Sequence, residues 1–290
     1  MMKRLVRYAA VLVSIIVSCA AVRAADLKNP NEIIAQSLKH IDSLESYSFT
    51  VWGKGIEKDL SDLEARTKNV KGDVADKYGK GMANKAADAP KDTGEPRKMG
   101  YHVSVKFMKP YLIQMKVDQS DYVPKIIYGS LMTYRPDNDP NVFWFKPKIS
   151  PAAIKREVAS ESGTLLYSSM HMDFIMMELL AKDAKPVLKG TKKVDDLECY
   201  DVAFEFPGGK GIKKYDVDFG KWKEIPKEAR PTVNKQAKSI FEKPVSSMHY
   251  LFDKKTLWLV GTEEYEPDGS LKYKKWWRDI KENHLSKKDF

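Results

Sequence analysis

The C-terminal part of the chain, Ser247 to Phe290, constrains the fold most strongly. Met248, Tyr250 and Phe252 fall on alternate positions, and this period of two is typical of a half-buried β-strand. Two further apolar runs follow. The turn Pro267-Asp268-Gly269 between them combines the fixed φ of proline with the freedom of glycine to take a positive φ. Strands joined by such short turns pair with their sequence neighbours, so the segment predicts an antiparallel meander of three strands.

The same alternation predicts further strands in the middle of the chain. The apolar positions of the two clearest are Tyr101, Val103, Val105 and Phe107, then Tyr111, Ile113, Met115 and Val117. Other strands are predicted at 47–52, 125–128, 131–135, 142–146 and 194–206. Regular alternation of this kind indicates a sheet with one apolar face and one solvated face.

Two segments change from the strand period to the helical period. Asn31 to Leu44 carries apolar residues at helical spacing, with Pro30 near its start. Thr164 to Ala181 is apolar around most of its circumference, so this helix is expected to be buried or to cover another apolar surface. Its length of about 27 Å is close to the width of five or six strands. We expect it to lie in the concavity of the sheet.

Two irregular segments are predicted to be insertions. Residues 53–98 are rich in Lys, Asp, Ala and Gly and poor in aromatic residues, so they cannot bury enough apolar surface to offset their ordering entropy. They are expected to form a flexible insertion in a hairpin, acting either as a solvated loop or as a contact arm for a partner or a membrane. Residues 207–244 are the second insertion, with a short helix predicted at 232–241.

Two motifs carry a resemblance to a known family. The meander ends in residues 279–290, which read Asp-Ile-Lys-Glu-Asn-His-Leu-Ser-Lys-Lys-Asp-Phe. Residues 106–116 form a "strand, basic-Pro, strand" pattern around Lys109 and Pro110. In both motifs the chain resembles the LolA/LolB-like superfamily, secreted bacterial proteins related to the periplasmic lipoprotein carrier. The resemblance spans the mature chain in order and is closer to an uncharacterised secreted branch than to the carrier itself.

The resemblance implies a fold and a lid. The expected fold class is α+β, a strongly curved antiparallel sheet or open half-barrel that wraps one or two helices. In such a fold, helices cover a hydrophobic cavity, and the apolar helix at 164–181 would take that place. Residues 25–290 would then form one β-rich domain that contains both insertions.

Residues 1–24 are predicted to be an export signal rather than part of this domain. A basic N-terminal region precedes the apolar run Ala9 to Val22, which is too short to span a bilayer comfortably, and a small-residue cleavage site ends at Ala24. An alternative in the same residues is a lipobox ending at Cys19, which would become acylated. The protein is therefore expected in the periplasm or, in the alternative, at the outer membrane as a lipoprotein.

The charge of the mature chain is moderate. The formal net charge of +10 falls to +6 when the signal is removed, because residues 1–24 contain four basic residues and no acidic ones. This charge can favour contact with anionic lipid head groups or envelope polymers. No nucleic-acid-binding motif is recognisable. No intramolecular disulfide is expected, since Cys199 is the mature cysteine and Cys19 would be capped if retained.

No catalytic constellation is recognisable, so an enzyme is not predicted. The five histidines lack metal-ligand spacing. Met170-His171-Met172-Asp173 contains donors that suit Cu(I), but methionine at helical spacing is more often core filler. Asp137-Asn138-Asp139 offers oxygen ligands, yet its flanking prolines indicate a tight turn rather than a calcium loop. Neither a cofactor nor a metal is predicted.

The main functional hypothesis is a lipoprotein-sorting-like envelope protein that binds an acyl chain, a lipid or a lipoprotein tail inside the curved sheet. The alternative is a non-enzymatic interaction or sensor module with a filled core. The residues alone leave the two open, and the resemblance favours the cavity. The choice of lining face depends on register, because a one-residue slip exchanges the two faces. The predicted ligand-binding residues are Phe49, Tyr101, Val103, Phe107, Tyr111, Ile113, Met115, Tyr134, Phe143, Phe145, Met170, Phe174 and Met177.

Overall fold

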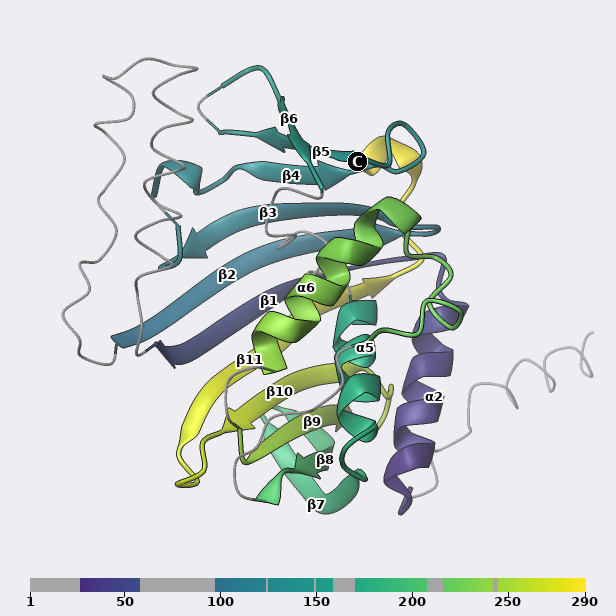
Figure 1. The fold of residues 1–290 in the computed structure, drawn as a ribbon, viewed down its shortest axis with the longest axis vertical. Coiled ribbons are helices and arrows are strands. Elements are labelled where there is room, and N and C mark those ends of the chain that lie inside the picture. The colour runs from purple at the N-terminus through teal and green to yellow at the C-terminus, as the bar shows by residue number, and fades with distance from the viewer. Residues whose placement is uncertain are drawn as a thin grey trace, which may run out of the picture.

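A computed structural model of the chain describes residues 27–57, 97–123, 125–148, 150–158, 170–207, 216–241 and 245–290. In these residues one open sheet of eleven strands carries three α-helices on its concave side (Figure 1). All neighbouring strands are antiparallel. The predicted fold class, α+β with a curved antiparallel sheet that does not close, is confirmed.

The elements follow the chain in this order. The first six strands are β1 (Ser46–Glu57), β2 (Arg97–Met108), β3 (Leu112–Ser120), β4 (Leu131–Tyr134), β5 (Val142–Lys146) and β6 (Ile154–Glu157). The last five are β7 (Val187–Val194), β8 (Leu197–Glu205), β9 (Ser247–Asp253), β10 (Leu259–Tyr265) and β11 (Leu271–Glu282). The helices are α2 (Pro30–Ser43), α5 (Met170–Ala181) and α6 (Arg230–Phe241), with short 3-10 turns η1 (Lys125–Ile127), η4 (Lys227–Ala229) and η5 (Lys287–Asp289).

The strand order divides the sheet into two wings. The order is β6-β5-β4-β3-β2-β1-β11-β10-β9-β8-β7, so the first and last strands of the chain pair at the centre. The predicted C-terminal meander is confirmed as β9, β10 and β11. β6 and β7 lie at opposite edges, separated by about 48 Å along the sheet at the usual strand spacing. The chain between them therefore crosses the sheet, and α5 lies on that crossing (Figure 1).

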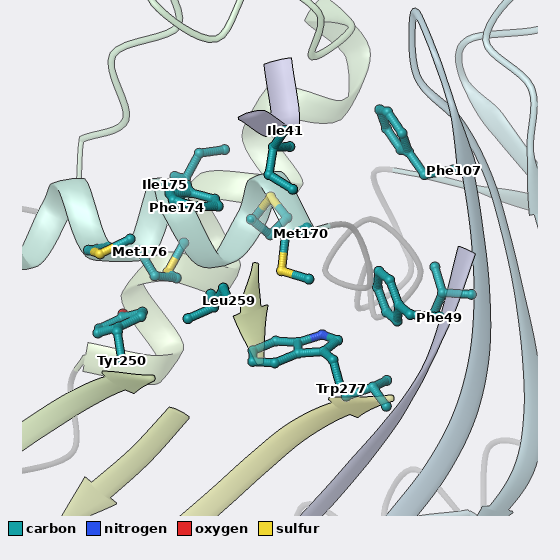
Figure 2. Close-up of a cluster of buried hydrophobic side chains, with 14 of the residues drawn as sticks. Ile41, Phe49, Phe107, Met170, Phe174, Ile175, Met176, Tyr250, Leu259 and Trp277 are labelled. Carbon is teal, nitrogen blue, oxygen red and sulfur yellow. The ribbon is translucent and has the colours of Figure 1, made fainter. Parts of the chain in front are cut away.

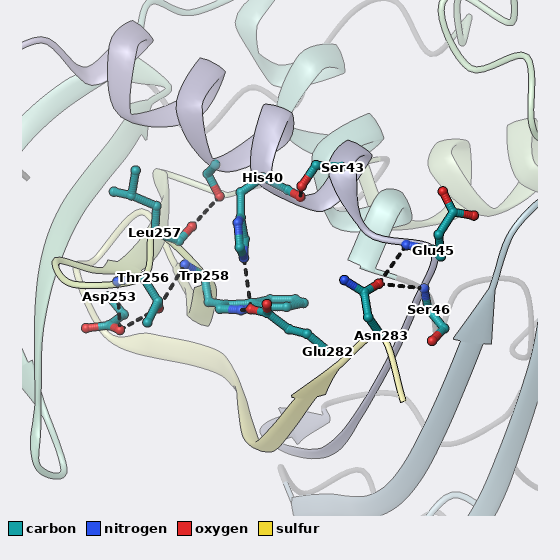
Figure 3. Close-up of polar contacts among 11 residues, drawn as sticks. His40, Ser43, Glu45, Ser46, Asp253, Thr256, Leu257, Trp258, Glu282 and Asn283 are labelled. Atoms are coloured by element: carbon teal, nitrogen blue, oxygen red, sulfur yellow. Dashed lines mark hydrogen bonds and ion pairs between the residues drawn. The ribbon is translucent and has the colours of Figure 1, made fainter. Parts of the chain in front are cut away.

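Helix α2 is fixed to the sheet by polar contacts from its C-terminal half (Figure 3). The Ser37 hydroxyl donates to the carbonyl of Leu257 at 2.5 Å. Trp258 donates its indole N–H to Glu282 at 2.6 Å, and His40 lies 3.0 Å from the same carboxylate. These contacts hold α2 against both the β9–β10 turn and the end of β11, while Ile33 and Ile41 on its inner face are fully buried.

The predicted start of the first insertion is wrong by several residues. The strand expected at 47–52 continues as β1 to Glu57, and β2 begins at Arg97, so 53–57 and 97–98 belong to the sheet. Glycine suits this part of β1, because a Cβ added at Gly53 would lie 2.3 Å from the ring of Tyr101 and 2.6 Å from the Tyr273 hydroxyl. The two rings occupy the space that a side chain would need. The rest of the predicted insertion, 58–96, lies outside the described residues.

Other boundaries also differ from expectation. The strand predicted at 125–128 is instead the 3-10 turn η1, where the Tyr128 N–H bonds to the Lys125 carbonyl at 3.0 Å and Gly129 takes a φ of 79°. Strands β6 and β7 were not predicted. The strand expected at 194–206 begins only at Leu197, since Asp195 turns the chain with a φ of 52°.

The second predicted insertion is partly integrated into the core. Its described part contains η4 and α6, which confirms the predicted helix. It also buries an apolar set that the sequence did not assign to the core: Val217, Trp222, Ile225, Ala229, Val233 and Ala237. Of the helix predicted at 164–181, the described part is α5, and 164–169 lies outside the described residues.

We predict that Gly53→Ala destabilises the sheet. The added Cβ would overlap the Tyr101 and Tyr273 rings, and overpacking of this kind costs about 1–3 kcal/mol. Urea denaturation measures the change. Gly220→Ala is the control, because Gly220 is exposed and a Cβ there would meet only an Asp218 carboxylate oxygen at 3.1 Å. Equal stability of the two variants would contradict the close approach at Gly53.

Candidate functional site

The concave face of the sheet is apolar and covered by α5. β1 and β2 pair with Phe49 opposite Val105 and Val51 opposite Val103, and these side chains are buried. Figure 2 shows Phe49, Phe107 and Trp277 of the sheet pointing towards the side of α5, where Met170 lies among them. The apolar alternation of the strands thus faces the helix, as expected for the covered side of a half-barrel.

The structure brings the predicted ligand-binding residues together on this face. Eleven of them belong to one buried cluster: Phe49, Val103, Phe107, Tyr111, Ile113, Met115, Tyr134, Phe143, Met170, Phe174 and Met177. Tyr101 and Phe145 are partly buried and pack against the same cluster. The side chains of the cluster contact one another, so in this state they form packed core. A role in binding a ligand stays a prediction.

Helix α5 has no solvated face. Ten of its twelve residues are buried, and four of those are the methionines at 170, 172, 176 and 177. The sheet contributes aromatic partners, such as Phe252, whose ring centroid lies 6.4 Å from that of Phe174. Thioethers and unbranched side chains adapt to irregular apolar surfaces. The contact between helix and sheet is therefore extensive and has little directional character.

One ion pair interrupts this apolar contact. Lys275 of β11 projects to the concave side and donates to the carboxylate of Asp173 on α5. The exposed fractions of the two residues are 9% and 6%, and the ammonium lies 4.7 Å from the centroid of the Trp277 ring. Beside the pair, the Tyr273 hydroxyl donates to that of Tyr101 at 2.8 Å. A small polar cluster thus lies inside the apolar face.

Burial and the neighbouring groups shift the pKa values within this cluster. Burial lowers the pKa of Lys275, but Asp173, Tyr101 and Glu264 together raise it above its ordinary value. Burial raises the pKa of Asp173, and Lys275 offsets this only in part. Burial also raises the pKa of Tyr101 and of Tyr273, so both hydroxyls stay protonated near neutral pH. Lys275 was not among the predicted site residues, although it shares the alternate positions of Tyr273 and Trp277 in β11.

A separate cleft of about 340 Å³ lies between α2, the end of β2, α5 and residues 221–224. Its lining residues are Leu38, Asp42, Phe107, Lys109, His171, Glu178, Lys221, Trp222 and Glu224. The buried His171 lies 3.7 Å from the Asp42 carboxylate and 3.3 Å from the Tyr47 hydroxyl. The Glu178 carboxylate accepts from the Trp222 indole at 3.0 Å. The cleft is therefore a mixed polar opening beside the apolar core.

The described residues include both metal sites that the sequence had suggested. Among them, no group of three or more His, Cys, Asp or Glu side chains is placed to hold a metal ion. His171, which stood in the possible copper motif, contacts Tyr47 and Asp42 instead. Within the same part of the chain, no helix is both long and apolar enough to cross a membrane.

Comparison with known proteins gives likenesses of fold only. No family model matches the chain, and no curated protein matches it. A similar solved structure is lipoprotein LppX of Mycobacterium tuberculosis, at 11% identity over 89% of this chain and 96% of that chain, with a TM-score of 0.40. An uncharacterized conserved protein from Thermus thermophilus is 8% identical over 89% and 90% of the two chains, with a TM-score of 0.41.

A LolA superfamily protein from Nitrosomonas europaea is also similar, at 9% identity over 90% of this chain and 97% of that chain, with a TM-score of 0.30. At such identities and TM-scores these likenesses carry nothing about function, which must come from the chain's own residues.

Cys199 is predicted to be chemically inert in the folded protein. Its thiol is fully buried in β8, and burial, with help from Asp253, raises its pKa to about 12. At pH 8 only about one thiol in ten thousand would then be ionised, and the thiolate is the reactive form. Iodoacetamide should label Cys199 at least about a hundredfold more slowly in the native protein than in guanidinium. Rapid native labelling would contradict the burial.

The Asp173–Lys275 pair is predicted to be strongly coupled. Lys275→Met or Asp173→Leu alone should destabilise the protein by about 3–5 kcal/mol, because each leaves a buried charge uncompensated. The double variant Asp173→Leu/Lys275→Met should recover most of this loss, since well-packed apolar residues often replace a buried pair without net loss. Chemical denaturation of the four proteins gives the coupling energy, and additive effects would show that the two residues act independently.

Proposed function

We propose that the chain is an exported envelope protein that binds an acyl chain, as a free lipid or as a lipoprotein tail, between α5 and the concave face of the sheet. The observation that carries the proposal is the burial of α5 on all sides by methionine and aromatic contacts. Burial of acyl CH₂ groups contributes about 0.8 kcal/mol each and has no directional requirement. An apolar surface without directional contacts suits an apolar ligand such as an acyl chain.

Binding requires exchange rather than filling of an empty space. The predicted lining residues already contact α5 and one another, so an acyl chain that enters between them would replace part of the direct contact between α5 and the sheet. Because the acyl chain is apolar on both sides, the helix and sheet surfaces that it separates stay buried against it, so the exchange removes little net burial. Export, and hence access to envelope lipids, is supported by the predicted signal in residues 1–24.

The same packing supports a second candidate, a non-enzymatic interaction or sensor module with a permanent core. Phe107, Tyr111 and Tyr134 are fully buried, as in any stable sheet domain. In that case the predicted contact arm between β1 and β2 would bind the partner. The two candidates differ in whether an acyl chain can enter between α5 and the sheet.

Native mass spectrometry of the mature protein purified from its own envelope tests the first candidate. We expect a stoichiometric mass that contains an acyl group and is lost on delipidation. Oleate added to the delipidated protein at a hundred times its Kd should stabilise it by about 2.7 kcal/mol, a rise in Tm of about 5–10 °C. Butyrate is the matched control, because it has the same carboxylate but its short chain buries too little apolar surface. An apo mass with no thermal shift would refute acyl binding.

Deletion of residues 58–96 separates the two candidates. The cut lies between the ends of β1 and β2, so a short Gly-Ser linker can rejoin the hairpin. We expect the deleted protein to fold and to keep its oleate-induced rise in Tm. Loss of partner capture from envelope extracts, together with no oleate effect in either protein, would favour the interaction module instead.

A further inference from the structure

Lys275 is the one described lysine that the sheet holds at 9% exposure, and its position demands a negative partner. Its ammonium pairs with Asp173 and lies over the ring of Trp277, and Tyr101 acts on it electrostatically. Replacement of buried ion pairs by apolar residues is often neutral or stabilising. Packing of α5 alone therefore does not explain why a lysine occupies this position.

The counter-ion of Lys275 sits on the element that the proposed exchange would move. Asp173 belongs to α5, whereas Lys275, Tyr101 and Tyr273 belong to the sheet. When α5 leaves this part of the face, Asp173 leaves with it. A ligand with a neutral head group would then leave the lysine without that carboxylate in an apolar environment, which is strongly unfavourable. A ligand with an anionic head group would replace one negative charge by another.

We propose that Lys275, together with the hydroxyl of Tyr101, to which Tyr273 donates, binds the anionic head group of the acyl ligand in the place that the Asp173 carboxylate occupies in the closed state. This assignment rests on the proposed function and specifies its ligand class as acidic lipids. The head group is the carboxylate of a fatty acid or the phosphate of a glycerophospholipid, since both accept charge-assisted hydrogen bonds from an ammonium.

The neighbouring groups fit this role. Tyr101 accepts the hydrogen bond from Tyr273, so its own O–H can donate to an anion. Glu264 lies opposite Tyr273 on β10 and is the other acidic group close to the cluster. The exchange of Asp173 for one ligand anion leaves the net charge around Glu264 unchanged. An anion therefore meets no more repulsion than Asp173 does now.

Paired ligands that differ only in head-group charge test the assignment. Affinities of the delipidated mature protein are measured by calorimetry for oleic acid against methyl oleate, and for phosphatidic acid against the matching diacylglycerol. In the unmodified protein we expect the acidic member of at least one pair to bind more tightly by about tenfold or more, the ratio that a charge-assisted hydrogen bond supplies. The ligand pair that shows the preference identifies the bound head group as a carboxylate or a phosphate.

Two variants separate head-group binding from simple anchoring of α5. Lys275→Met should abolish the preference for the acidic ligand. Asp173→Asn removes the competing carboxylate but keeps Lys275, so both ligands should bind more tightly while their affinity ratio is retained. If Lys275→Met folds poorly, the double variant Asp173→Leu/Lys275→Met should also have lost the preference.

The outcomes are distinct. An affinity ratio near one in the unmodified protein, or a preference that survives Lys275→Met, would overturn the head-group site while leaving acyl binding intact. Failure of all four ligands to bind would refute the proposed function itself. A preference lost equally in Asp173→Asn and Lys275→Met would show that the pair only positions α5, and would also overturn the assignment.

Discussion

The pairing of the first strand with the last is the constraint on which the rest of the structure depends. β1 pairs with β11 from Tyr47 opposite Glu282 to Gly55 opposite Tyr273, and this ladder joins two wings that are otherwise built from sequence neighbours. Because the wings grow outwards from the centre, β6 and β7 end at opposite edges. The chain must return across the concave face, and a helix that makes this return is buried against the sheet. The apolar character of α5 thus follows from the topology.

The polar contacts of α5 determine where it lies on that face. The apolar contacts of α5 keep it on the sheet, but they do not select one position of the helix over a neighbouring one, because methionine side chains adapt to many surfaces. Three polar contacts do select one position of α5 on the sheet. The Met170 N–H donates to the Tyr47 hydroxyl at 3.0 Å, Glu178 accepts from Trp222, and Asp173 pairs with Lys275. Buried polar pairs of this kind are known to specify register in other helical contacts.

The sequence predicted the parts of the fold that local periodicity determines. The alternation through Tyr101–Phe107 and Tyr111–Val117 identified both strands and placed the same side chains on the covered face, and the turn at Pro267-Asp268-Gly269 located the meander. The pairing of β1 with β11 joins residues more than two hundred positions apart, and no local pattern reports it. The short edge strands were missed because β7 is lysine-rich, with Lys189, Lys192 and Lys193, and resembles a solvated loop.

The candidate site shows the same division. The apolar lining was predictable, because each of its side chains follows the strand or helix period. Lys275 was not identified, since Lys272 and Lys274 beside it made the whole run resemble a solvated strand. The sequence does show that Lys275 lies on the same side of the strand as Tyr273 and Trp277, because the three residues alternate. A lysine on the apolar side of a strand must be paired with an opposite charge when it is buried. Such a residue is a stronger indication of function than any aromatic neighbour, because apolar packing alone accounts for the aromatics.

A packed core and a lipid-binding face are compatible descriptions of this molecule. If α5 rests on the face along which an acyl chain would lie, the ligand must replace the contact between helix and sheet with contacts of its own, and the affinity is the difference between two similar apolar contacts. Such a difference is small and insensitive to chain shape, so it favours loose specificity for the tail. Discrimination must then arise where helix and ligand differ chemically. In the described residues that place is Lys275, which an incoming lipid can satisfy only by supplying the charge that Asp173 withdraws.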